Sequence, residues 1–144
     1  MSEPLYRAVR AAGRLADTLE NEPGPPVCLA VVDDGGTLVY LHRMAGAPAR
    51  LVAIATAKAY TAVRMGQPTQ SFRERLERER LTLADFQDTG LTSLPGGWPL
   101  SLTGNLWAGL GISGRTLAED ERLCRRWLDS LNMDSQGETG GVAS

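Results

Sequence analysis

Apolar positions along the chain predict an alternation of helices and hairpins. Over residues 5–19 apolar side chains recur every three or four positions, which is typical of an amphipathic helix. A continuous apolar run over 27–32 predicts a strand that is covered on both faces. The alternating stretch 37–42 predicts its hairpin partner, joined through the turn signal Asp33-Asp34-Gly35-Gly36. An alanine-rich helix is expected over about 49–65, ended by a glycine.

The second half of the chain predicts a charged helix, a second hairpin and a last helix. The charged segment covers 72–80, and the strands cover 98–103 and 106–112. A capping box at Thr116 and Glu119 marks the start of the last helix. Because hairpins pair antiparallel, this order predicts an α+β layered domain and excludes a doubly wound parallel fold.

Composition and charge narrow the class of protein. A length of 144 residues suits one domain, which we expect over 1–131, followed by a polar, Gly-rich disordered tail over 132–144. With 15 basic and 17 acidic side chains, the chain lacks the basic excess that grips nucleic acid. Apolar runs stay below the about 18 residues of a membrane span, and no secretory leader is visible. We therefore expect a cytoplasmic protein without nucleic-acid or membrane partners.

Cysteine and histidine are scarce. Cys28 and Cys124 are isolated from each other and from the histidine, so we expect two buried thiols without a disulfide scaffold or zinc site. His42 is the single histidine, so any histidine metal ligand or catalytic triad must use this residue.

A Gly-x-Gly-x-x-Gly motif occupies residues 109–114. A dinucleotide site would require a parallel βαβ unit after it, and the chain has only one more helix. Two interpretations stay open. The glycines allow close packing of a helix on a strand and a tight turn, or the backbone N–H groups of 113–116, with Gly114 among the binding residues, hold a carboxylate or phosphate.

Lys58 is the single charged residue between Leu51 and Val63. A helix with so little polar cover predicts close packing on several sides, where an ammonium group needs an acidic partner. Three interpretations stay open: the amine extends to solvent along one stripe, pairs with Asp33 or Asp34, or meets the anionic part of a ligand.

Two further segments carry groups suited to chemistry. Asp33 and Asp34 are paired carboxylates fit for acid–base work, although the same residues make a good hairpin turn. His42, Arg43 and Met44 follow one another where a strand passes into a loop, a common place for ligand-binding groups. Imidazole and thioether both ligate haem iron. A packed or surface histidine is the alternative interpretation.

Several of these segments together resemble the GlcG/HbpS family, which includes the C-terminal domain of PduO-type proteins. The matching segments, in the family's order, are 30–39, 42–48, 57–62, 94–100, 109–114 and 119–121. The resemblance implies a five-stranded antiparallel sheet with helices on both faces, a profilin-like sandwich, assembled into dimers or larger homo-oligomers. Ala45 stands where the family's loop usually has aspartate, and the hairpin turn near residue 104 also lacks the usual acid.

The resemblance also implies a function. Some family members bind haem or its degradation products, so the first hypothesis is a small-ligand-binding protein whose ligand is haem or a related tetrapyrrole. In that hypothesis His42 ligates the metal, Met44 is a weaker ligand, and Arg43 or Lys58 pairs with the propionates.

Two alternatives from other classes remain. One is an enzyme acting on a small carboxylate or carbonyl metabolite, in which Lys58 binds the acid or serves as base or Schiff-base amine, and Asp33 and His42 transfer protons. The other is a structural oligomerisation module whose three tryptophans fill the core or subunit interfaces.

Overall fold

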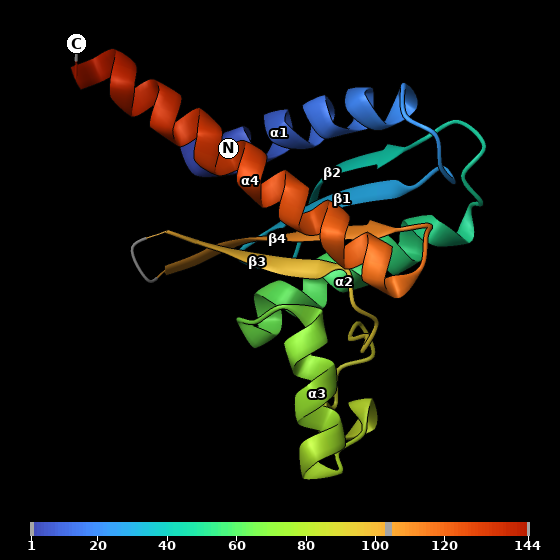
Figure 1. Ribbon diagram of the computed structural model, residues 1–144. Helices are drawn as coiled ribbons and strands as arrows, with labels where there is room; N and C mark the ends of the chain where they lie inside the picture. The colour runs from blue at the N-terminus through green and yellow to red at the C-terminus, as the bar shows by residue number, and fades with distance from the viewer. Residues whose placement is uncertain (1, 103–104, 144) are drawn as a thin grey trace.

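The computed structural model describes the backbone of residues 2–102 and 105–143 and the side chains of 2–101 and 108–132. Its helices and strands follow the predicted order (Figure 1). They are α1 (Glu3–Glu20), β1 (Cys28–Asp33), β2 (Leu38–Arg43), α2 (Arg50–Met65), α3 (Thr69–Glu79), the 3-10 turn η1 (Leu83–Phe86), β3 (Gly97–Leu102), β4 (Asn105–Ser113) and α4 (Leu117–Ala143). The α+β class is confirmed.

The described part of the chain forms one antiparallel sheet of four strands in the order β2-β1-β4-β3. The fifth strand implied by the resemblance is absent from this sheet, and residues 91–94 do not form a strand. That segment is used differently: the N–H of Thr92 donates to Oγ1 of Thr61 on α2 at 2.9 Å, and Leu91 packs with Phe72 of α3. The segment is therefore a connection between α3 and β3.

One face of the sheet is covered by α1 and α4, which contact each other; in Figure 1 α1 lies above the strands and α4 crosses diagonally in front of them. Because side chains alternate along a strand, Leu29 and Val31 of β1 point to this face together with Leu110 and Ile112 of β4. Trp127 of α4 is fully buried among them, and its Nε1 donates to the carbonyl of Ala8 at 3.1 Å. Large apolar side chains fill the space between these layers.

Helix α2 covers the opposite face and packs at backbone distance. A Cβ at Gly109 would overlap the carbonyl oxygen of Ala59, and one at Gly111 would overlap that of Ala55. The packing interpretation of the glycine motif is therefore confirmed: glycine is required here because the helix backbone occupies the place of a side chain.

Helix α3 and η1 form an arm that extends away from the sheet (Figure 1). The arm has an apolar cluster of its own, with Phe72, Leu76 and Leu91 buried in it. The N–H of Thr82 donates to the Asp85 carboxylate at 2.8 Å, which stabilises the start of η1.

The predictions for the C-terminal tail and the tryptophans have mixed outcomes. Helical backbone continues in α4 to Ala143, so most of the segment 132–144 is helical; disorder there stays a prediction, and residue 144 lies outside the described residues. Trp127 belongs to the core, Trp98 is half-buried under the guanidinium of Arg125, and the side chain of Trp107 lies outside the described residues. No helix in the described chain has the length and apolar character needed to cross a membrane.

Candidate functional site

Lys58 is the most deeply buried charged residue that the sequence singled out. Its side chain is 1% exposed, and Nζ lies 3.1 Å from Oδ2 of Asp120 and 2.8 Å from the carbonyl oxygen of Ile112. Lys58 belongs to α2 and Asp120 to α4, which pack on opposite faces of the sheet. The lysine therefore passes the edge of the sheet at the start of β3, and the ion pair joins the two helical layers.

Two glycines make room for this passage. A Cβ at Gly96 would lie 2.8 Å from Nζ of Lys58, and a Cβ at Gly97 would overlap the backbone carbonyl of Lys58. The N–H of Gly97 donates to Oγ1 of Thr69 at 2.9 Å, which ties the start of β3 to the start of α3. Any larger residue at these positions would displace the lysine.

Asp120 occupies the first turn of α4 and closes the turn that precedes it. Its Oδ1 accepts a hydrogen bond from the N–H of Arg115 at 3.0 Å. Thr116 accepts from the N–H of Glu119 at 3.2 Å, which confirms the predicted helix cap. One of the backbone N–H groups predicted to hold an external anion, that of Arg115, thus binds a carboxylate of the chain itself.

Lys58 pairs with neither Asp33 nor Asp34, and that interpretation was wrong. Oδ1 of Asp33 accepts from the N–H groups of Gly35 and Thr37 at 3.0 and 2.9 Å, so the hairpin-turn interpretation is confirmed. Asp33 lies at the end of β1 opposite to the end nearest Lys58, because pairing with β4 starts at Ser113 and runs away from the ion pair. The structure therefore does not bring Asp33 into one site with Lys58.

Burial dominates the electrostatics of the ion pair. It lowers the pKa of Lys58, against the opposing effect of the Asp120 carboxylate, and raises the pKa of Asp120, against the opposing effect of Lys58. The neighbouring Cys124 donates from Sγ to the carbonyl of Gly96 at 3.0 Å, and burial raises the pKa of its thiol to about 12. Cys124 is therefore a structural thiol without the thiolate character of a nucleophile.

A cavity of about 240 Å³ adjoins the ion pair. It lies between the first half of α2, the loop before β3, and the turn from β4 into α4. Its lining combines three cationic residues and one carboxylate with apolar and small residues: Pro48, Arg50, Leu51, Ile54, Lys58, Leu94, Ser113, Gly114, Arg115, Leu117 and Asp120. The structure thus places Lys58 and Gly114, two residues predicted to bind a cofactor, in the wall of one cavity.

His42 lies on the other face of the sheet from α2. It pairs with Leu29 in the ladder and therefore points toward α1, as does Tyr40. The side chain is 37% exposed, and Nε2 lies 3.8 Å from Oε1 of Glu20, beyond hydrogen-bond distance. Nε2 is shielded from solvent and has no hydrogen-bond partner among the described residues. The structure therefore separates His42 from Lys58 by the sheet.

The two residues after His42 already make internal contacts. Nε of Arg43 donates to the carbonyl of Ala47 at 2.7 Å, on the α2 face. Met44 is buried, and its sulfur accepts from the N–H of Val27 at 3.4 Å. In the part of the chain that is described, no three His, Cys, Asp or Glu side chains gather as a metal site.

Both cysteines are buried and free, as expected. Sequence reasoning did not identify the roles of Asp120 and Arg115. Asp120 stands between two other acids, Glu119 and Glu121, and only the position of the lysine selects it as the partner.

Comparison with known proteins identifies relatives of this chain. A family model for haem-degrading, HbpS-like proteins matches residues 5–129. An uncharacterised 15.0 kDa protein from the dhaT-dhaS intergenic region of Citrobacter freundii is 31% identical over 128 residues, covering 85% of this chain and 89% of that protein.

Two solved structures extend the comparison. The structure of a PduOC–haem complex is 28% identical with a TM-score of 0.73, covering 90% of this chain and 94% of the other. A double mutant of HbpS from Streptomyces reticuli is 32% identical with a TM-score of 0.71, covering 87% and 82%.

Proposed function

We propose, from the premise that this chain belongs to the HbpS-like family of haem-degrading proteins, that it is a small-ligand-binding protein whose ligand is haem or a related tetrapyrrole. The similar PduOC domain was solved as a haem complex, which supports this choice of ligand. His42 is the residue that we assign to the iron.

The observation that carries this assignment is the uncommitted imidazole nitrogen of His42. Among the residues predicted as iron ligands, Met44 already uses its sulfur as an acceptor within the fold. Nε2 of His42 has no such bond in the described chain, and its ring is half-exposed on an edge strand. A free nitrogen on a partly exposed ring is the donor that an axial iron ligand requires.

Tyr40 lies on the same face of β2 as His42, half-buried and pointing toward α1, and it offers an aromatic surface beside the imidazole. When bound, haem supplies redox and oxygen chemistry at its iron. Glu20 stands in front of Nε2, so the ring must rotate or the carboxylate must move before the nitrogen reaches a ligand. Assembly into homo-oligomers stays a prediction.

Hemin titration of the purified protein tests this proposal. We expect a saturable Soret shift with the wild-type protein, loss of that shift in His42→Ala, and its partial return when imidazole is added. Glu20→Ala is the matched control: it removes the shielding carboxylate and should keep or increase hemin affinity. Absence of a shift in the wild-type protein, or an unchanged shift in His42→Ala with an unchanged melting temperature, would refute the assignment.

A further inference from the structure

We propose that the cavity beside Lys58 is a second ligand site, which takes a small aliphatic monocarboxylate. This site lies on the α2 side of the sheet edge, whereas His42 lies on the α1 face. The two proposals therefore rest on different residues, and either can fail without the other.

The first argument is the unused hydrogen-bonding capacity of Lys58. An ammonium group has three N–H donors. Two of them are used by the carbonyl of Ile112 and the carboxylate of Asp120, and no third acceptor is found among the described residues. Because Lys58 lines the cavity, a ligand oxygen there would satisfy the remaining donor of a buried cation.

The second argument is the charge of the wall. The Asp120 carboxylate is paired with Lys58, which leaves Arg50 and Arg115 as an excess of positive charge around the cavity. Nε of Arg115 donates to the carbonyl of Pro25 at 2.9 Å, while its Nη2 is shielded and has no partner within the described chain. Nη2 of Arg115 lies against Gly24, whereas Arg50 is exposed and retains guanidinium donors of the kind that bind carboxylates.

The third argument is size and polarity. A volume of about 240 Å³ lies below the about 300–1,000 Å³ of sites that hold drug-sized ligands, which suits a short acid better than a tetrapyrrole. Leu51, Ile54, Leu94 and Leu117 give the walls an apolar part that matches an aliphatic tail.

The Asp120 carboxylate favours a singly charged group beside Lys58. Lys58 neutralises only one negative charge, and Asp120 lies in the wall of the same cavity. A phosphate dianion would bring a second charge close to that carboxylate, where like charges repel more strongly than in water. A monocarboxylate avoids this repulsion and still accepts from the lysine and Arg50.

Isothermal titration with butyrate, with butyramide as the neutral isostere and inorganic phosphate as the dianion, tests the site. We expect saturable binding of butyrate, and butyramide and phosphate at least about tenfold weaker, since hydrogen bonds to charged groups are the stronger ones. Equal binding of butyrate and butyramide, or tighter binding of phosphate, would overturn the proposal.

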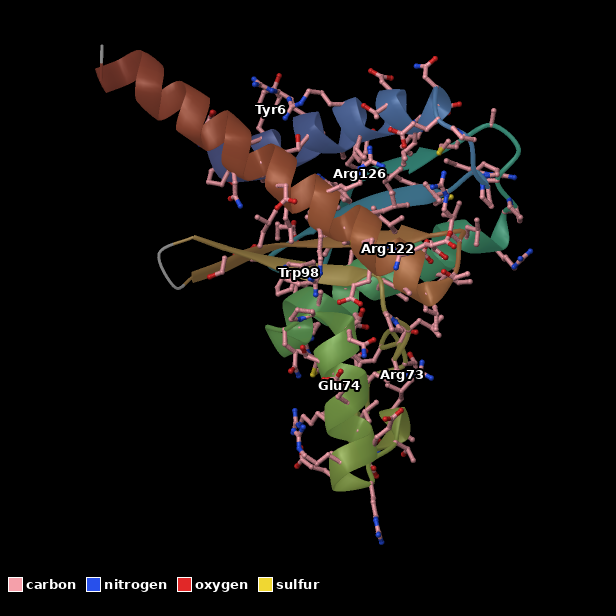
Figure 2. The ribbon with its side chains drawn as sticks, in the orientation of Figure 1. Tyr6, Arg73, Glu74, Trp98, Arg122 and Arg126 are labelled. Atoms are coloured by element: carbon pink, nitrogen blue, oxygen red, sulfur yellow. The ribbon has the colours of Figure 1, made fainter. Side chains whose placement is uncertain are left out.

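A pair of arginine variants locates the binding. Arg50→Gln removes an exposed cation from the cavity wall and should weaken butyrate binding about five- to tenfold. Arg73→Gln is the matched control, because Arg73 does not line the cavity and lies on α3, away from Arg122 at the start of α4 (Figure 2). Equal affinities of the two variants would overturn the location.

The same titration separates this proposal from haem binding. His42→Ala should bind butyrate as the wild-type protein does, and saturating butyrate should leave the hemin titration unchanged. Loss of butyrate binding in His42→Ala would contradict the separation of the two sites.

Discussion

The two faces of the sheet are packed in different ways. Helix α2 lies against glycines, so close to β4 that its carbonyl oxygens occupy the places of side chains at Gly109 and Gly111. On the other face, α1 and α4 are held off by large side chains, with Trp127 fully buried between them and the strands. One layer is fixed by backbone contact and the other by side-chain volume.

This difference explains where the polar groups lie. Because α2 sits so close to the sheet, the side chain of Lys58 reaches past the start of β3 to α4. There the ammonium group of Lys58 donates hydrogen bonds to Asp120 and to the carbonyl of Ile112. On the face covered by α1 and α4, the single polar residue proposed to bind a ligand is His42, which lies on the edge strand β2. The closely packed face thus holds a buried ion pair between Lys58 and Asp120. The edge of the other face holds the His42 ring, whose Nε2 has no hydrogen-bond partner among the described residues.

The largest effect is expected from breaking the ion pair. Asp120→Asn keeps an acceptor for the N–H of Arg115 but leaves Lys58 as a buried amine without its counter-charge. We expect the free energy of unfolding to fall by about 3–5 kcal/mol, measured by urea denaturation. The double variant Lys58→Met/Asp120→Leu should recover most of the loss, because apolar residues can replace a buried pair at little cost. A loss below about 1 kcal/mol in Asp120→Asn would instead place the pair in the range of exposed ion pairs.

A smaller effect is expected from adding one methyl group to the backbone-packed face. Gly111→Ala should lower the free energy of unfolding by about 1–3 kcal/mol, because the added methyl group would push the carbonyl of Ala55, and α2 with it, away from β4. Gly13→Ala is the matched control: nothing lies within 4 Å of its added Cβ, and it sits inside α1. It should stabilise the protein by about 0.5–1 kcal/mol. Similar effects of the two changes in thermal or urea unfolding would show that the two layers do not differ as described.

The smallest effect on stability is expected from the thiols of Cys28, on the α2 face, and Cys124, on the opposite face, and it depends on pH. Burial raises the pKa of Cys28 and raises that of Cys124 from 9.0 to about 12. Because the folded pKa of Cys124 exceeds its unfolded value, this thiol stabilises the fold fully below pH 9.0, and the contribution is lost as the pH rises toward 12.

Alkylation by iodoacetamide, followed by mass spectrometry, checks this expectation. Both cysteines of the folded protein should stay largely unmodified between pH 7 and 9, whereas in urea their modification should accelerate about tenfold or more across this range. Rapid alkylation of Cys124 in the folded protein at pH 8 would contradict its burial.

Local sequence patterns located most of the helices and strands and the N-cap of α4, but not the continuation of α4 to Ala143. Periodicity located α1 and α2 within two residues at their ends, and Thr116 with Glu119 marked the start of α4. The Asp33 turn and the packing interpretation of the glycine motif were also accessible, because each depends on backbone conformation or on the absence of a side chain.

Tertiary structure alone decided which of these groups meet. Lys58 has seventeen acidic residues in the chain as candidate partners, and the one it pairs with is 62 positions away. That choice depends on how α2 and α4 pack on opposite faces and approach one another at the start of β3. Such a contact is set by the distance and orientation of whole layers, which no local pattern encodes. For the same reason the sequence could propose Lys58 and His42 as one site, and only the folded chain placed the sheet between them.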